Sequence, residues 1–195
     1  MATNTIEIGI LGMGRIGASL GLALKRYNTG KNVPQQFRVT VYDTSESRLS
    51  AAKSLGAFDV QTRSIHDAIR DKALIVLAIP YADASAAYRE IGSAARPGQV
   101  IMDLSPLKSP SLEWAKKYLP AEVFMIGAAP ILNPSYLFDS LDETENARAD
   151  LFDKGGMLIM PTVNSIPDAV ELVTDLCGLI HAPTRFADPL EYDTW

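Results

Sequence analysis

Three glycines stand within six residues near the N-terminus, after a short apolar run and before apolar residues at helical spacing. Such a turn presents backbone N–H groups and the positive end of a helix dipole to a bound pyrophosphate. Gly12 allows the tight turn, Gly14 lets the backbone approach the phosphates, and Gly17 lets the helix pack on the sheet. A glycine-rich turn without a ligand is the alternative. The predicted phosphate-binding residues are Gly12, Met13, Gly14, Arg15, Ile16 and Gly17.

An acidic residue, Asp43, ends the second predicted strand, where a Rossmann domain binds the adenosine ribose. It follows the last glycine at a longer interval than usual, because the polar segment 28–36 is inserted between helix and strand. A carboxylate here accepts hydrogen bonds from the ribose 2′-OH and repels a 2′-phosphate, which favours NAD over NADP. Arg48 argues the other way, since a guanidinium turned inward would meet that phosphate. Asp43 as a simple turn or cap residue is the alternative.

The end of the central apolar run carries Ala78, Ile79 and Pro80. Ligands of this fold class lie outside the carboxyl ends of the strands, near the point where the strand order reverses. These residues therefore either line the cofactor groove or simply end a strand, and the sequence supports both interpretations equally.

The next strand ends in Asp-Leu-Ser-Pro-Leu-Lys at positions 103–108. A hydroxyl and an ammonium group at this edge are suited to contact a polar substrate or a carboxamide. Ser105 and Lys108 are therefore the candidate catalytic residues. The alternative is a capped helix start with a solvated lysine.

Other reactive side chains show no catalytic or metal-binding pattern. His66 and His181 fit surface or helix-end positions, and Cys177 lies among apolar residues of a predicted helix. A single cysteine forms no intrachain disulfide, which fits a reducing cytoplasm. No metal site is predicted.

The elements that position these residues alternate between strand and helix in the first part of the chain. Parallel neighbouring strands need crossover helices, so this order predicts an α/β, doubly wound, mostly parallel sheet of the Rossmann type with helices on both faces. We read residues 127–145 as one long loop, and Ser109 and Pro110 as the cap and first position of a helix. The predicted strands are 6–11, 38–42, 73–79, 100–104, 123–126, 157–160 and 184–186, and the main predicted helices are 16–27, 45–55, 81–95, 109–118 and 166–179.

Length and charge limit the class of protein. The 195 residues suffice for one Rossmann domain over 1–187, with 188–195 expected to start a helical domain that is truncated or absent. The longest apolar run is too short to cross a membrane. A net charge of -5, with scattered basic residues, argues against nucleic acid as a partner.

Several segments together resemble the prephenate dehydrogenase family. These are the run 12–21, the motif at 103–108, residues 147–152 followed by 158–161, and the C-terminal stretch 188–193. The resemblance implies an oxidoreductase of tyrosine biosynthesis that transfers a hydride from prephenate or arogenate to NAD or NADP. It also implies a helical second domain and a homodimer.

The chain departs from the family pattern at three positions. The family's catalytic histidine precedes a proline, and the matching pair here is Ala129-Pro130. The family's serine before the lysine falls on Pro106, and a second histidine is replaced by Tyr192. A histidine at the first position would hydrogen-bond the ring hydroxyl of the substrate as the hydride leaves, which alanine cannot do.

The leading hypothesis is an NAD-dependent dehydrogenase acting on a small acid. Two alternatives stay open: a dinucleotide-binding or sensing module without catalysis, and an S-adenosylmethionine-dependent methyltransferase. The third glycine and the short turn favour the dinucleotide over the methyl donor.

Overall fold

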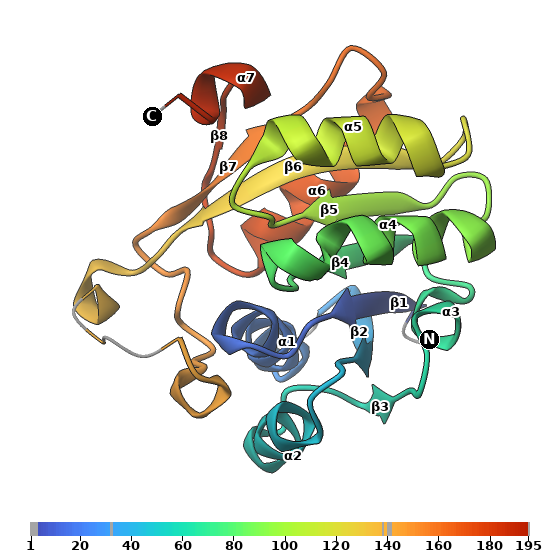
Figure 1. Cartoon of the computed structure of the whole chain (residues 1–195). Helices are drawn as coiled ribbons and strands as arrows, with labels where there is room; N and C mark the ends of the chain where they lie inside the picture. Colours follow the sequence, from blue (N-terminus) through green and yellow to red (C-terminus); the bar gives the residue numbers. More distant parts are fainter. Residues whose placement is uncertain (1–3, 32, 138, 140–141, 195) are drawn as a thin grey trace.

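The computed structural model describes residues 4–31, 33–137, 139 and 142–194. In this part of the chain, eight strands form one sheet in the order β3-β2-β1-β4-β5-β6-β7-β8. Strands β1 to β6 run parallel, β7 pairs antiparallel with β6, and β8 runs parallel to β7. The predicted doubly wound Rossmann sheet is therefore confirmed (Figure 1).

The strands are β1 (Asn4–Leu11), β2 (Gln35–Tyr42), β3 (Val60–Gln61), β4 (Leu74–Leu77), β5 (Val100–Asp103), β6 (Phe124–Ile131), β7 (Gly156–Met160) and β8 (Thr184–Phe186). The helices are α1 (Arg15–Asn28), α2 (Glu46–Leu55), α3 (Ile65–Ile69), α4 (Tyr81–Ala94), α5 (Lys108–Tyr118), α6 (Pro167–Leu179) and α7 (Pro189–Tyr192), with the 3-10 turns η1 (Pro134–Tyr136) and η2 (Thr144–Asn146). No described helix is both long and apolar enough to cross a membrane.

Alternating side chains of the strands build two separate cores. Val76 and Met102 point to the face covered by α1, α2 and α6, whereas Ile75 and Ile101 point to the face covered by α3, α4 and α5. Strands buried on both faces read as continuous apolar runs, which is why β4 was readable from the sequence. The register aligns Leu11, Leu77 and Asp103, so the ends of β1, β4 and β5 meet at one edge of the sheet.

Local capping signals explain two helix boundaries. Gly56 adopts a left-handed conformation at the C-cap of α2, with φ of 77°. The Ser64 hydroxyl accepts a hydrogen bond from the backbone N–H of Asp67 at the start of α3.

Three sequence predictions need correction. Strand β6 continues to Ile131 because β7 pairs with it antiparallel, so the predicted loop at 127–145 begins only after the strand. Helix α5 begins at Lys108, and Ser109 is in its first turn instead of at the cap. The two-residue strand β3 was missed because so short an element leaves no periodic pattern.

Candidate functional site

Two of the three glycines in the first turn are required by packing. A Cβ atom at Gly12 would lie 2.2 Å from the Ala78 carbonyl oxygen, and the φ of Gly12 is 98°. A Cβ atom at Gly17 would lie 2.0 Å from the Gly12 oxygen. These clashes involve backbone atoms, which cannot move aside without shifting β1 or β4. The turn therefore holds α1 directly against the sheet edge.

The remaining glycine of the turn, Gly14, faces open space. A Cβ atom at Gly14 would meet no described atom within 4 Å. Gly14 is also the N-cap of α1, where it has no side chain to occupy the N–H groups of the first helical turn. The first hydrogen bond of the helix runs from Ala18 N–H to the Gly14 oxygen at 3.0 Å. The N–H groups that precede Ala18 in the first turn are those that a helix leaves free to bind an anion.

The Asp43 carboxylate joins the two loops that border this space. Its Oδ2 accepts a hydrogen bond from Met13 N–H at 2.6 Å, and its Oδ1 accepts one from Ser45 N–H at 2.7 Å. The residue is buried. Asp43 therefore fixes the glycine turn relative to the end of β2, while each oxygen keeps a second lone pair for a hydroxyl donor.

The remaining predicted cofactor residues differ in their surroundings. Ala78 is half-buried against the glycine turn, and its N–H donates to the Leu11 oxygen at 2.8 Å. Ile79 is also half-buried, and Pro80 is the exposed N-cap of α4. Arg48 is exposed on α2.

Lys108 is completely buried at the ends of β5 and β6. Its Nζ donates to the backbone oxygens of Asp103, Ser105 and Ala128, which uses all three ammonium hydrogens. Burial lowers the pKa of Lys108 to about 8, although Asp103 and Asp193 act in the opposite direction. The side chain is a clamp between two strand ends.

Ser105 differs from Lys108 in having a hydroxyl to spare. Its backbone N–H donates to the Asp103 Oδ1 atom at 2.6 Å, but its buried Oγ has no hydrogen-bond partner among the described residues. The second Asp103 oxygen accepts from the Tyr88 hydroxyl at 2.7 Å, and burial followed by the Asp103 charge raises the pKa of Tyr88 well above its ordinary value. An unsatisfied buried hydroxyl in an otherwise satisfied network marks a place for a polar ligand atom.

The pair Ala129-Pro130 lies inside β6, not in a loop after it, and pairs with Leu158 and Met157 of β7. Ala129 is buried directly after the carbonyl that Lys108 binds. Tyr192 lies in α7, and its ring is 5.8 Å from the Lys108 ammonium. Ala129 and Tyr192 thus flank the Lys108 clamp.

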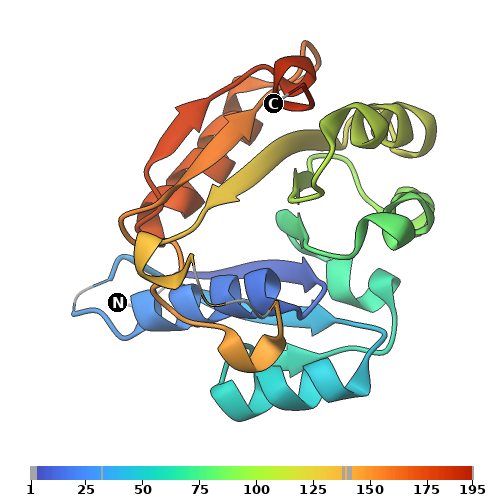
Figure 2. The ribbon, with the colours of Figure 1, turned by 60° about the vertical axis from the view of Figure 1, so that its left-hand side comes forward.

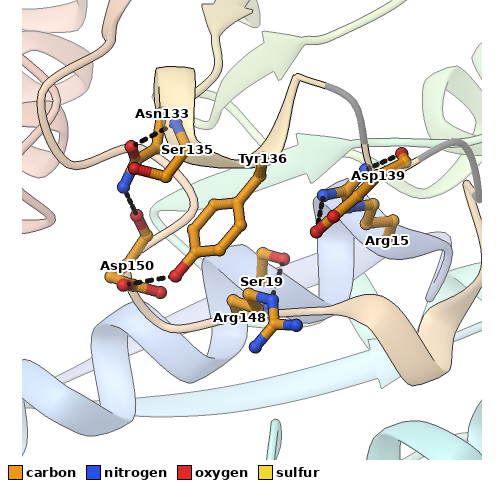
Figure 3. A network of polar contacts seen from close by, with 8 residues as sticks. All are labelled: Arg15, Ser19, Asn133, Ser135, Tyr136, Asp139, Arg148 and Asp150. Carbon is orange, nitrogen blue, oxygen red and sulfur yellow. Dashed lines mark hydrogen bonds and ion pairs between the residues drawn. The ribbon is translucent and has the colours of Figure 1, made fainter.

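The segment between β6 and β7 returns to the glycine turn, where η2 packs beside α1 and α2 (Figure 2). The Thr144 hydroxyl donates to the Met13 oxygen at 2.6 Å, and Arg148 N–H donates to the Ser19 hydroxyl at 2.9 Å. Figure 3 shows the Tyr136 hydroxyl pointing towards Asp150, to which it donates a hydrogen bond at 2.7 Å. This segment therefore holds both the glycine turn, at the Met13 carbonyl, and helix α1, at Ser19.

Arg15 lies under the same segment, in the first turn of α1, and only 5% of the residue is exposed. Its Nη1 donates to the Asp139 backbone oxygen at 3.2 Å, and its Nη2 is 3.7 Å from the Asp139 carboxylate. Nε and Nη2 have no hydrogen-bond partner in the described part of the chain. A buried guanidinium with unused donors beside a helix N-terminus is an incomplete anion site.

Sequence reasoning missed Thr144, Tyr88 and Asp193. The Thr144 contact joins residues 131 positions apart, and no local pattern reports such a contact. Asp193 accepts hydrogen bonds from the N–H groups of Lys108 and Ser109, both at 2.7 Å, and so caps α5. Tyr88 had the spacing of an ordinary core residue.

Comparisons with known proteins point to one family. The sequence model described as "Prephenate dehydrogenase, nucleotide-binding domain" matches residues 20–184. A prephenate dehydrogenase of Bacillus subtilis (strain 168) is 24% identical over 185 residues, which cover 94% of this chain and 47% of that protein. A cyclohexadienyl dehydrogenase of Zymomonas mobilis is 25% identical over 174 residues, which cover 87% of this chain and 54% of that protein.

A solved structure has the same fold. Prephenate dehydrogenase from Aquifex aeolicus in complex with hydroxyphenyl propionate and NAD+ superimposes with a TM-score of 0.79 at 17% identity, over 99% of this chain and 63% of that chain. The chain thus spans about half the length of the curated relatives that it matches.

Proposed function

This chain belongs to the prephenate dehydrogenase family through its nucleotide-binding domain, and on that basis we propose that it binds NAD as the cofactor half of a dehydrogenase that oxidises a small acid. The observation that carries the proposal is the open space at Gly14, in front of the first turn of α1. The unused donors of Arg15 border the same turn. A pyrophosphate fits this combination of backbone N–H groups, helix dipole and guanidinium.

Asp43 supports NAD over NADP in this proposal. Its carboxylate is fixed by two backbone N–H groups at the end of β2, so it cannot easily turn away from a ribose placed there. The remaining lone pairs accept from the 2′-OH and 3′-OH, whereas a 2′-phosphate would meet a buried negative charge. Arg48 is exposed on α2 and remains the candidate for any residual NADP binding.

At the other end of the site, bound NAD supplies the hydride acceptor. The free hydroxyl of Ser105 is placed to hold the carboxamide or a polar group of the substrate. Lys108 acts as a positioning residue in this proposal, because its ammonium holds the ends of β5 and β6 together. The packed apolar core beneath excludes water from that edge.

Two relatives are described as dehydrogenases of prephenate and of cyclohexadienyl compounds, and we extend a substrate of that class, a small cyclic acid, to the complete protein. From the family resemblance we also propose a role in tyrosine biosynthesis, a homodimer, a cytoplasmic location and a second domain starting near residue 188. A spectrophotometric assay of reduced-cofactor formation with prephenate and arogenate tests the activity on a chain that includes this second domain. The absence of turnover with both acids would contradict it.

A specific observation favours one second candidate, a dinucleotide-binding or sensing module. Ala129 stands in β6 beside the Lys108 clamp, where its side chain can neither give nor take a proton. Tight NAD binding combined with no turnover in that assay would support the module. Measurable turnover would exclude it.

The decisive binding test compares two glycine variants by calorimetric titration with NAD and NADP. Gly14→Ala leaves the fold intact, since its Cβ meets no described atom within 4 Å, but it fills the phosphate approach. We expect NAD to bind at least tenfold more weakly, a loss of about 1.4 kcal/mol. Gly178→Ala is the matched control, because its Cβ also has open space but lies on α6.

The same titrations decide the cofactor. NAD binding at least tenfold tighter than NADP supports the role of Asp43. Equal loss of affinity in both glycine variants, or no binding of NAD by the unchanged chain, would overturn the proposal. In the second case S-adenosylmethionine is the next ligand to titrate.

A further inference from the structure

Arg15 and Asp139 form a contact whose strength does not match the burial of the guanidinium. The Arg15 side chain is 6% exposed, whereas the Asp139 side chain is 41% exposed. Their charged groups approach only to 3.7 Å, and the hydrogen bond at 3.2 Å goes to the Asp139 backbone oxygen. Figure 3 shows the two side chains side by side, with Arg15 at the start of α1.

Such a pair leaves the buried charge poorly compensated. A buried guanidinium normally makes several charge-assisted hydrogen bonds, often in a two-pronged arrangement with a carboxylate or phosphate. Here Nε and Nη2 make none with the described residues. A 3.7 Å approach to an exposed carboxylate contributes little, so Asp139 is a weak occupant of a site that could hold a stronger anion.

The position of the pair identifies that anion. Arg15 is the first residue of α1 and directly follows Gly14, the glycine with open space beside it. The helix dipole and the free N–H groups of this turn attract a phosphate to the same place. A phosphate oxygen offers the short, charged acceptor that the 3.7 Å carboxylate does not provide.

We propose that Asp139 is an internal competitor for Arg15, and that the pyrophosphate of the dinucleotide displaces it when the cofactor binds. The inference rests on the proposed function, because it takes NAD as the ligand of the glycine turn. Breaking the Arg15–Asp139 contact then lowers the affinity for the cofactor. The contact of Asp139 with Arg15 also differs between the free and the cofactor-bound chain. The contacts of Thr144 and Arg148 do not have to change, since they go to Met13 and Ser19 instead of to the guanidinium.

The test is the affinity of the whole 195-residue chain for NAD and for ADP-ribose, measured calorimetrically in three variants. Asp139→Asn removes the competing charge at an exposed position and should bind both ligands roughly two- to fivefold more tightly. Glu145→Gln removes one negative charge from an exposed side chain of the same segment and should leave both affinities unchanged. Arg15→Met should weaken both ligands about tenfold or more, because it removes charge-assisted hydrogen bonds.

The double variant Arg15→Met with Asp139→Asn isolates the competition. Without Arg15 the Asp139→Asn substitution should bring no gain in affinity. A gain that persists without Arg15, or one equal to that of Glu145→Gln, would overturn the inference while leaving NAD binding in place. If Arg15→Met does not fold, the neutral Arg15→Gln takes its place, and the comparison of Asp139→Asn with Glu145→Gln still decides.

Failure of the proposed function gives a different result. In that case neither the unchanged chain nor Asp139→Asn would bind NAD or ADP-ribose, and both proposals would fall together. If the unchanged chain and Asp139→Asn bind NAD with identical affinity, the competition by Asp139 is contradicted, whereas the proposed NAD binding stands.

Discussion

Some residues of the candidate site are required for packing, whereas others are open to a ligand. Gly12 and Gly17 are fixed by backbone atoms within 2.2 Å of a virtual Cβ, so their loss would disturb the fold before it disturbed a ligand. Gly14 has no such neighbour and is the position where a substitution reports on binding alone. Lys108 is required for packing, because its ammonium group donates all three hydrogens to backbone oxygens. Reactive residue types are therefore not equally available to a substrate.

Cys177 permits a residue-scale prediction about pH. Burial on α6 raises the pKa of its thiol to about 12, from an ordinary value of 9.0. A raised folded-state pKa gives stability that is complete below pH 9 and is lost as the pH rises towards 12. The stability difference between the unchanged chain and Cys177→Ala should shrink by about 2 kcal/mol between pH 8 and pH 10.5.

Urea unfolding at both pH values measures this difference, and the comparison cancels the tyrosines and lysines common to both chains. In the same samples an aromatic disulfide reagent at pH 8 should modify Cys177 only after unfolding. A constant difference across the pH range would mean that the thiol is not buried in the core.

At the scale of elements, α5 is stabilised by a residue from the far end of the chain. Its own N-cap, Leu107, makes no side-chain hydrogen bond, and Asp193 accepts from the first two N–H groups instead. Burial raises the pKa of Asp193, but the hydrogen bonds from Lys108 and Ser109 outweigh it and lower the pKa below 3.8. Figure 1 shows α7 beside the start of α5, where this contact forms.

Asp193→Ala should therefore lower the free energy of unfolding by about 1–2 kcal/mol, as the loss of a helix cap does. Denaturant titration measures the loss, and faster amide exchange at Lys108 and Ser109 would locate it. Glu191→Ala, an exposed neighbour in α7, is the control and should change stability by less than about 0.5 kcal/mol. At acidic pH the difference between Asp193→Ala and the unchanged chain should fade, because the Asp193 contribution is lost as the pH falls through its lowered pKa.

The segment between β6 and β7 supports the glycine turn through Thr144. Its buried hydroxyl donates to Met13, whose N–H is held by Asp43. Thr144→Val keeps the shape and removes the donor, so it should cost about 1–2 kcal/mol and weaken NAD binding several-fold through a looser turn. Thr29→Val removes a similar but exposed hydrogen bond to Arg26 and should change neither quantity appreciably. Equal effects of the two variants on NAD affinity would contradict a supporting role for the segment.

For the whole molecule, the sheet and its phosphate turn could be predicted because their signals are local. Continuous apolar runs indicated β4 and β5, and the helix predicted at 45–55 agrees with α2 to within one residue. The length of β6 could not be predicted, because its last residues are strand only through pairing with β7. The same holds for the Asp193 cap and the Thr144 contact, which join distant parts of the chain.

In the candidate site too, features with a local sequence signal could be predicted, and those that depend on distant contacts could not. Residue types and spacing located the glycine turn, Asp43 and the 103–108 motif at one edge of the sheet, as the register requires. Only the three-dimensional contacts separated the free hydroxyl of Ser105 from the fully engaged ammonium of Lys108. The unused donors of Arg15 were equally invisible in the sequence, because they depend on what a segment more than a hundred residues away provides.

The distant cap of α5 also has a consequence for synthesis on the ribosome. Asp193 follows Lys108 by 85 residues, so α5 leaves the exit tunnel long before its cap has been translated. Sheet strands β1 to β6 can pair in that interval, whereas the first turn of α5 must wait with its N–H groups open to water. The first turn of α5 thus stays uncapped until residue 193 has been translated, and a translation pause before that residue would prolong the exposure of the Lys108 and Ser109 N–H groups to water.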